Sequence, residues 1–252
     1  MRFPLIAALE TMPGVAPLQE TLREAFPYMA QERVQEVSLV IGPAGPAGGA
    51  GAASVTWNLT NDAGTLIVIG AGSATLSAGA SYDTVEAFSE DFERMLQALE
   101  SVGVPRCDRL GVRYLSLAAG LPGEDRSWRR WFKPELLGWA GSDTVANGVL
   151  ETSINQVMLR QAPTGDLAGP PADVQATVRH GAVPAGTDVP GIPPLQVPNP
   201  AYLLDLDVYV AGHQPFDPSR ILEQFEMFHT QIDRFFYWSL TREGAEHFGI
   251  VN

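Results

Sequence analysis

The stretch RLGVRYLSL at residues 109–117 decides the fold, because its first residues alternate in character. On an extended chain, three apolar side chains fall on one side and two arginines on the other: Leu110, Val112 and Tyr114 against Arg109 and Arg113. A second stretch, LDLDV at 204–208, repeats the pattern with aspartates in place of arginines. Both stretches predict strands with one buried face and one charged face.

The bulk composition is that of a folded, acidic protein. The 252 residues are 45% hydrophobic, enough to bury a sizeable core in one large or two small domains. The formal net charge of −13 repels phosphate backbones and anionic membranes, which argues against nucleic-acid partners. It favours a basic protein partner, although acidity also serves solubility alone. No stretch reaches the length of a membrane span, and the apolar opening lacks a signal-peptide cleavage site. A cytoplasmic protein is expected.

The first part of the chain predicts a strand, a helix, three strands and a second helix. The expected ranges are a strand at 3–10, a helix at 17–26 opened by Pro17, strands at 34–41, at 55–60 and from Leu66 toward Leu76, and a helix at 84–101 capped by Asp83 or Thr84. The stretch GPAGPAGGAG at 42–51 is predicted to be a flexible hairpin loop, because no Lys-Ser/Thr follows it to make a phosphate loop.

The same order is predicted again in the second part. The expected ranges are a strand at 107–117, a short helix at 127–137, strands at 149–160, 173–180 and 202–210, a final helix starting at Asp217-Pro218, and loops at 162–171 and 181–200.

This order predicts an α+β fold, with helices on one face of an antiparallel sheet. It further suggests a tandem β-α-β-β-β-α duplication, with halves 1–104 and 105–252 forming one structural unit. The order is similar to that of the TATA-binding-protein saddle and the helix-grip folds, an analogy of topology that says nothing about function.

The residue types that usually act in catalysis or bind metals are present, but most lack the partner residues that such a site requires. Cys107, the single cysteine, is expected to be a buried thiol at the start of its strand. His229 and Asp233 share a helix face at i, i+4, but no third metal ligand accompanies them. The sequence shows no nucleophile elbow or dinucleotide fingerprint, so no cofactor and no metal are expected.

Two groups of residues are candidates for binding. The alternation places Arg109 and Arg113 on one sheet face with Asp205 and Asp207, either as a solvated network of cross-strand pairs or as anchors for a partner. The stretch RSWRRWFK at 126–133 is basic and aromatic; its candidates are Arg129, Arg130 and Trp131, although part of such a helix must pack in the core. His229 is a further candidate.

The order of three motifs resembles a sporadically distributed family of uncharacterised bacterial proteins. The motifs are RLGVRY at 109–114, LDLDV at 204–208, and a long helix with His229, Asp233 and Phe236 leading to SLT at 239–241. The resemblance spans almost the whole chain and implies a single structural unit and a cytoplasmic, prokaryotic setting. Members typically carry Asn where this chain has Ser116, so no role of that amide carries over. The resemblance implies no activity.

Three functions from different classes follow. The leading hypothesis is a non-enzymatic interaction or accessory protein that neutralises a more basic partner. The first alternative is a small-ligand binder with a cavity between the final helix and the sheet, which a large enclosed apolar pocket would favour. The second is an enzyme of unfamiliar type using Arg113, Asp205 and Asp207, which a cleft with strongly perturbed carboxylates would favour. The oligomeric state is left open.

Overall fold

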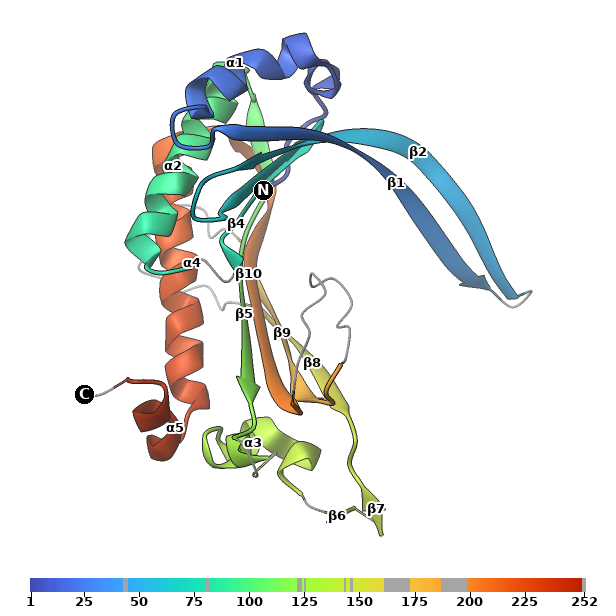
Figure 1. Ribbon diagram of the computed structural model, residues 1–252, viewed down its shortest axis with the longest axis vertical. Helices are drawn as coiled ribbons and strands as arrows, with labels where there is room; N and C mark the ends of the chain where they lie inside the picture. Colours follow the sequence, from blue (N-terminus) through green and yellow to red (C-terminus); the bar gives the residue numbers. More distant parts are fainter. Residues whose placement is uncertain are drawn as a thin grey trace. The chain divides into compact units, whose positions relative to one another are not determined.

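The structure is a computed structural model that describes residues 1–42, 45–79, 82–121, 124, 126–142, 144–145, 147–160, 173–186 and 199–250. Within these residues, two four-stranded antiparallel sheets and five α-helices form the α+β fold expected from the sequence (Figure 1). The chain divides into two compact units: the first is Met1–Leu110 with Ala211–Gln224, and the second is Gly111–Val210 with Phe225–Asn252.

The sheet of the first unit has the strand order β1-β2-β3-β4. Its strands are β1 (Tyr28–Gly42), β2 (Gly45–Thr60), β3 (Leu66–Gly70) and β4 (Ser73–Ser77). Strands β1 and β2 pair from Tyr28↔Thr60 to Gly42↔Gly45, so the loop expected at 42–51 is wrong for residues 45–51. A backbone ladder needs no side chains, and a run of Gly and Ala therefore does not prevent it. Residues 43 and 44 lie outside the described part.

Three other expectations for the first unit are corrected. The strand at 3–10 is absent: Arg2 alone bridges to Ser73 and Arg109, and the 3₁₀-helix η1 (Ala7–Glu10) follows Pro4, which lacks an N–H for a ladder. Helix α1 (Met12–Leu22) begins before Pro17, because Thr11 Oγ1 caps it by accepting from Gly14 N at 3.3 Å. The third strand does not run on to Leu76, since the chain turns at Gly72 and returns as β4.

The second helix confirms the expected range. Helix α2 (Val85–Ser101) begins after Thr84, whose Oγ1 accepts from Ala87 N at 3.2 Å, and the chain leaves it through Gly103 at φ +71°. Its buried stripe includes Phe92, Met95 and Leu96. Helices α1 and α2 pack against each other, so this apolar stripe is part of the first unit's core.

The sheet of the second unit has the order β5-β10-β9-β8. Its strands are β5 (Arg106–Ala119), β10 (Ala201–Pro215), β9 (Val174–Val183) and β8 (Ser153–Arg160). The last strand therefore lies beside the first, as the charge patterns had suggested. The strand expected at 149–160 starts only at Ser153, because the preceding residues form the small hairpin of β6 (Thr144–Val145) and β7 (Gly148–Val149). The loop expected at 162–171 lies outside the described residues. The loop expected at 181–200 is wrong for residues 181–183, which belong to β9, and its residues 187–198 lie outside the described part.

The helices of the second unit differ from expectation at one place. Residues 127–137 form η3 (Ser127–Arg130) and α3 (Pro134–Leu137) rather than one helix, followed by η4 (Gly138–Gly141). Pro134 holds Lys133 in an extended conformation, which interrupts the helix. The final helix α4 (Pro218–Ser239) begins as expected, with Arg220 N donating to Asp217 Oδ1 at 3.2 Å. A short helix α5 (Arg242–His247) follows.

Alternation along the strands creates two different sheet faces in the second unit. Leu204, Leu206 and Val208 of β10 are buried on the face toward α4, where Phe228 and Ile232 are also buried. Asp205 points to the opposite face. The tandem duplication is not confirmed, because the two units differ in their order of elements. The first unit has four strands between α1 and α2. In the second, the small β6–β7 hairpin and then the three strands β8, β9 and β10 lie between the helical region and α4.

Candidate functional site

A three-residue ion cluster occupies the polar face of the second unit's sheet. Arg113 of β5 donates from Nε to Asp205 Oδ1 at 2.7 Å and from Nη2 to Oδ2 at 2.9 Å. Arg179 of β9 lies directly opposite Asp205 in the β9–β10 register and donates from Nε to Oδ2 at 2.7 Å. The cluster therefore ties three neighbouring strands together through a single carboxylate.

The central carboxylate is buried while its two partners reach solvent. The Asp205 side chain is 2% exposed, against 35% for Arg113 and 28% for Arg179. The hydrogen bond to Asp205 raises the pKa of the Arg113 guanidinium. Because guanidinium N–H groups occupy both oxygens, this carboxylate is poorly placed to take a proton from a substrate. Its geometry is that of a structural anchor.

The expected four-residue network is therefore found only in part. Arg113 and Asp205 pair as predicted, and the negative charge of Asp207 also raises the pKa of Arg113. Arg109 belongs to the first unit, where its carbonyl oxygen accepts from Arg2 N at 2.8 Å. Arg179 was missed as a cluster member, although its outward position on β9 was visible in the alternation.

His229 connects the final helix α4 to strand β5. Its Nδ1 shares a hydrogen bond with Tyr114 Oη at 3.1 Å, and the two rings stack with centroids 5.7 Å apart. Its Nε2 lies 3.3 Å from Asp233 Oδ2. Both ring nitrogens are thus engaged within the chain, and in the described ranges no group of three or more His, Cys, Asp or Glu is placed to hold a metal.

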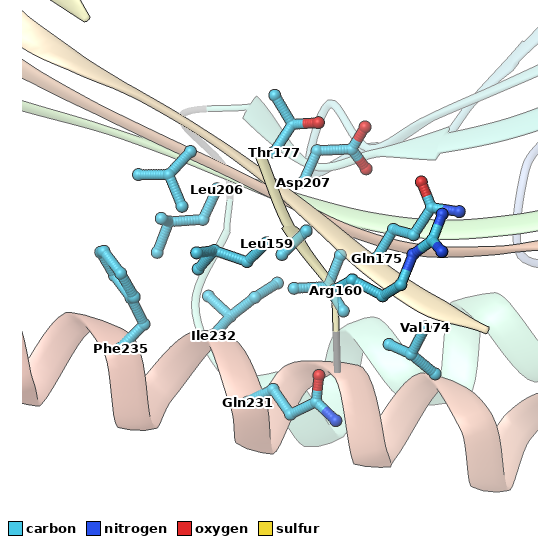
Figure 2. A pocket seen from close by; sticks show the side chains of 13 residues that line it. Leu159, Arg160, Val174, Gln175, Thr177, Leu206, Asp207, Gln231, Ile232 and Phe235 are labelled. Atoms are coloured by element: carbon cyan, nitrogen blue, oxygen red, sulfur yellow. The ribbon is translucent and has the colours of Figure 1, made fainter. Parts of the chain in front are cut away.

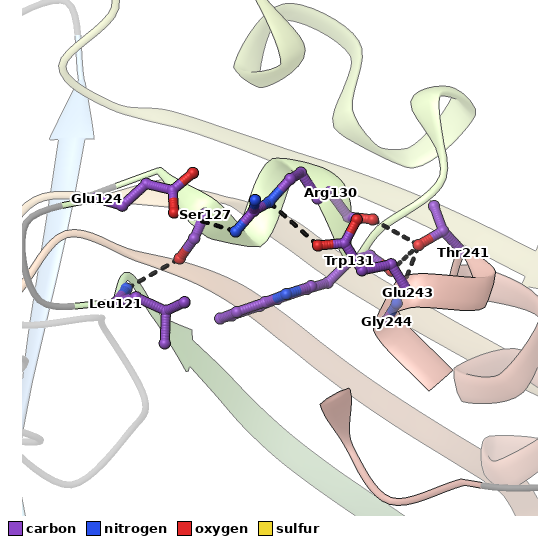
Figure 3. A network of polar contacts seen from close by, with 8 residues as sticks. All are labelled: Leu121, Glu124, Ser127, Arg130, Trp131, Thr241, Glu243 and Gly244. Atoms are coloured by element: carbon purple, nitrogen blue, oxygen red, sulfur yellow. Dashed lines mark hydrogen bonds and ion pairs between the residues drawn. The ribbon is translucent and has the colours of Figure 1, made fainter. Parts of the chain in front are cut away.

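The basic, aromatic stretch at 126–133 is fixed by a polar network (Figure 3). Arg130 contacts Glu124 at 3.0 Å and Glu243 at 3.2 Å, so its charge is balanced inside the unit. Thr241 Oγ1 donates to Arg130 O and accepts from Gly244 N, which joins η3 to the start of α5. This network gives the stretch a defined conformation.

The two remaining candidates of that stretch are also engaged. Trp131 is buried, and its ring stacks on His247 with centroids 3.8 Å apart and an interplanar angle of 9°. Arg129 donates from Nη2 to Ser142 O at 2.7 Å and lies over the Trp128 ring. Trp131 is therefore a packing residue, and Arg129 lines a pocket described below.

A groove of about 180 Å³ lies between α4 and the sheet (Figure 2). Its apolar wall comes from both elements: Leu159, Val174, Leu206, Ile232 and Phe235. The groove is smaller than the roughly 300–1,000 Å³ of a typical small-molecule site. It is large enough for one or two apolar side chains, and it opens next to the sheet edge at β8.

Strand β8, like Arg179, is a feature that the sequence analysis did not single out. It is the last strand in the order β5-β10-β9-β8, and in the described part of the chain no strand pairs with its outer side. Four apolar side chains on it are between 43% and 66% exposed: Ile154, Val157, Met158 and Leu159. In the sequence, apolar residues occupy both alternating positions of SINQVMLR with a single charge at Arg160, a pattern that also fits a strand buried on both faces.

Comparisons with known proteins add no relative. No family model matches the chain, and neither the curated proteins nor the solved structures gave a match. The resemblance based on the motifs at 109–114, 204–208 and 229–241 stays a prediction. Among the described residues, no helix is both long and apolar enough to cross a membrane.

Proposed function

We propose that this chain is a protein-interaction factor that binds an extended segment of a more basic partner along the outer edge of β8. The observation that carries the proposal is the combination of four exposed apolar side chains with an edge that no strand in the described part of the chain pairs with. Edge strands are normally protected by charges, proline or a covering element, because they present a row of backbone donors and acceptors. Strand β8 has only Arg160, at its end.

An added strand would find complementary contacts on both faces of the sheet. Val157 lies opposite the buried Val178 on the α4 side, and Leu159 lines the groove there. Ile154 and Met158 alternate to the other face. Backbone hydrogen bonds would supply affinity, and an apolar side chain of the partner entering the α4 groove would supply specificity.

The charge of the chain supports a basic partner. With a formal net charge of −13, the protein attracts a cationic surface over a distance of about one Debye length, roughly 8 Å at physiological salt. Long-range attraction brings the partner near, and the apolar edge then holds it. The proposed segment is therefore extended, apolar at alternate positions, and flanked by Lys or Arg.

A photo-cross-linking residue at Met158 tests the proposal directly. Met158 is 66% exposed, so the replacement leaves the core intact. We expect an adduct with one partner, located by mass spectrometry in a basic segment. The purified partner is then titrated against the parent chain and against Met158→Lys, which places a positive charge on the edge.

The matched control is Met12→Lys, which makes the same change at a residue that is 55% exposed in the first unit. We expect Met158→Lys to weaken binding at least about tenfold through like-charge repulsion and lost apolar contact, with Met12→Lys unchanged. Equal weakening by both variants, or an adduct only with a second copy of this chain, would contradict a basic partner at β8.

A small-ligand binder is the second candidate function. The groove beneath α4, where such a cavity was expected, is too small to favour it. A different pocket, next to η3, does favour a small ligand, and it carries the inference below.

A further inference from the structure

A second pocket of the second unit lies beside η3 and measures about 370 Å³. This volume is within the range of small-molecule sites, roughly 300–1,000 Å³. Its polar wall contains Arg126, Trp128 and Arg129. Its apolar wall is formed mainly by Leu150, Val183 and two prolines, Pro184 and Pro200.

The two guanidinium groups are held in place by backbone carbonyls. Arg126 donates from Nη2 to Leu150 O at 2.7 Å, and Arg129 donates from Nη2 to Ser142 O at 2.7 Å. A guanidinium carries five N–H donors in a fixed plane, so a bond from one nitrogen orients the group, and the bond of Arg126 to Leu150 O uses one of its five donors. No carboxylate in the described residues forms an ion pair with Arg126.

Trp128, which lines the same pocket, carries a buried donor. Trp128 is 2% exposed, and its Nε1 has no acceptor within hydrogen-bonding distance among the residues that the structure describes. A buried N–H without an acceptor is unfavourable, so buried indoles usually have a partner. An oxygen atom of a bound ligand would supply one.

We propose that this pocket binds a small organic carboxylate with an apolar body. The carboxylate lies toward Arg126 and Arg129, which match its planar pair of oxygens, and it accepts from Trp128 Nε1. The apolar body packs on Leu150 and the prolines. Among the described residues that line the pocket, two are arginines and one, the exposed Glu151, is a carboxylate. This inference is independent of the edge at β8.

The surrounding network keeps the donors in position before a ligand arrives. Leu121 N donates to Ser127 Oγ at 2.9 Å, and Arg130 joins Glu124 to Glu243 (Figure 3). These contacts fix both ends of η3, which carries Trp128 and Arg129. A site that is ordered in advance loses less entropy on binding.

Titration with benzoate, followed by the indole N–H signals in NMR, tests the proposal. Benzoate is an apolar ring with one carboxylate; benzamide is its neutral counterpart, and inorganic phosphate is an anion without an apolar body. The Trp128 signal is assigned by its disappearance in Trp128→Phe. The binding variant is Arg126→Gln, and the control for the loss of one positive charge is Arg23→Gln, an exposed arginine of the first unit that does not line the pocket.

We expect benzoate to shift the Trp128 signal, with Arg126→Gln binding about tenfold or more weakly and Arg23→Gln binding like the parent. Benzamide and phosphate should bind much more weakly than benzoate. The proposal is overturned if benzoate leaves the Trp128 signal unmoved, if Arg126→Gln binds like the parent, or if benzamide or phosphate binds as well as benzoate. Because Arg126 reaches solvent, its variant remains informative even if Trp128→Phe does not fold.

Discussion

Breaking the ion cluster at Asp205 should destabilise the second unit more than breaking it at Arg113. The Arg113→Ala variant leaves Asp205 with its bonds to Arg179. The Asp205→Ala variant instead leaves two arginines side by side without their shared carboxylate. We therefore expect about 1–2 kcal/mol for Arg113→Ala and about 3–5 kcal/mol for Asp205→Ala, the latter being the usual cost of breaking a buried pair.

The coupling between the two residues follows from their burial. Exposed ion pairs couple by about 0–1 kcal/mol, whereas hydrogen bonds to charged groups contribute about 1.5–3 kcal/mol. Two hydrogen bonds join Arg113 to Asp205. The Asp205 side chain is 2% exposed but the Arg113 side chain is 35% exposed, so solvent partly screens the charge of the guanidinium. We expect a coupling of about 1.5–2.5 kcal/mol in the double-mutant cycle of Arg113→Ala with Asp205→Ala.

Urea unfolding followed by tryptophan fluorescence measures this cycle in the relevant unit. Four of the five tryptophans lie there, and only Trp57 lies in the first unit. The control cycle is Arg242→Ala with Glu246→Ala, a single contact of the second unit at 3.0 Å between side chains that are 94% and 61% exposed, for which coupling should be near zero. If Arg113 and Asp205 couple no more strongly than this control pair, the cluster does not fix the sheet as argued.

Three further predictions concern stability. Acidification from about pH 7 to about pH 5 should destabilise the parent protein more than the His180→Gln variant. Burial lowers the pKa of His180 in the folded state below its ordinary 6.5, so over this pH range the unfolded chain gains a proton that the folded chain does not. Equal pH slopes of the unfolding free energy for the two proteins would contradict this. Gly181→Ala should lower the free energy of unfolding by about 1–3 kcal/mol and expose β8 amides to hydrogen exchange. The reason is that a Cβ at this position, where φ is +153°, would lie 1.6 Å from Ser153 O. Unchanged protection of the β8 amides would refute the clash. Phe228→Ala, at a fully buried position of α4, should cost about 3–5 kcal/mol, against little for the exposed Tyr237→Ala; similar denaturation midpoints for both would show that α4 does not carry the core.

The fold was largely predictable where side-chain period and capping agree. The alternation at 109–117 and 204–208 located β5 and β10, and Thr84 and Asp217 marked the starts of α2 and α4. Prediction failed where strand pairing rests on backbone hydrogen bonds without a side-chain pattern. The β1–β2 hairpin continues through Gly and Ala residues because its ladder needs no side-chain pattern.

The candidate site was predictable only in its local part. Arg113 and Asp205 have opposite charges, and the alternation of each strand places both on the same sheet face, so their pairing was predictable. That Arg179 joins them could be known only from the order of the strands in the sheet. That β8 is an edge also follows from strand order and not from its own residues. The pocket beside η3 gathers residues from 126 to 200, and no spacing rule in the sequence brings these together.

The two units are interleaved along the chain, and this sets the order in which they can be completed during synthesis. The first unit needs residues 211–224: His213 Nδ1 lies 2.7 Å from Asp108 Oδ1, and Phe216 N donates to Pro105 O at 3.3 Å. A nascent chain that has emerged only to residue 110 therefore lacks part of this unit. Although domains generally fold from the N-terminus as they are made, here the N-terminal unit must wait for a segment that follows most of its neighbour. A ribosome-stalled fragment ending before residue 211 should accordingly leave the first unit open to proteolysis, while extension beyond residue 224 should protect it.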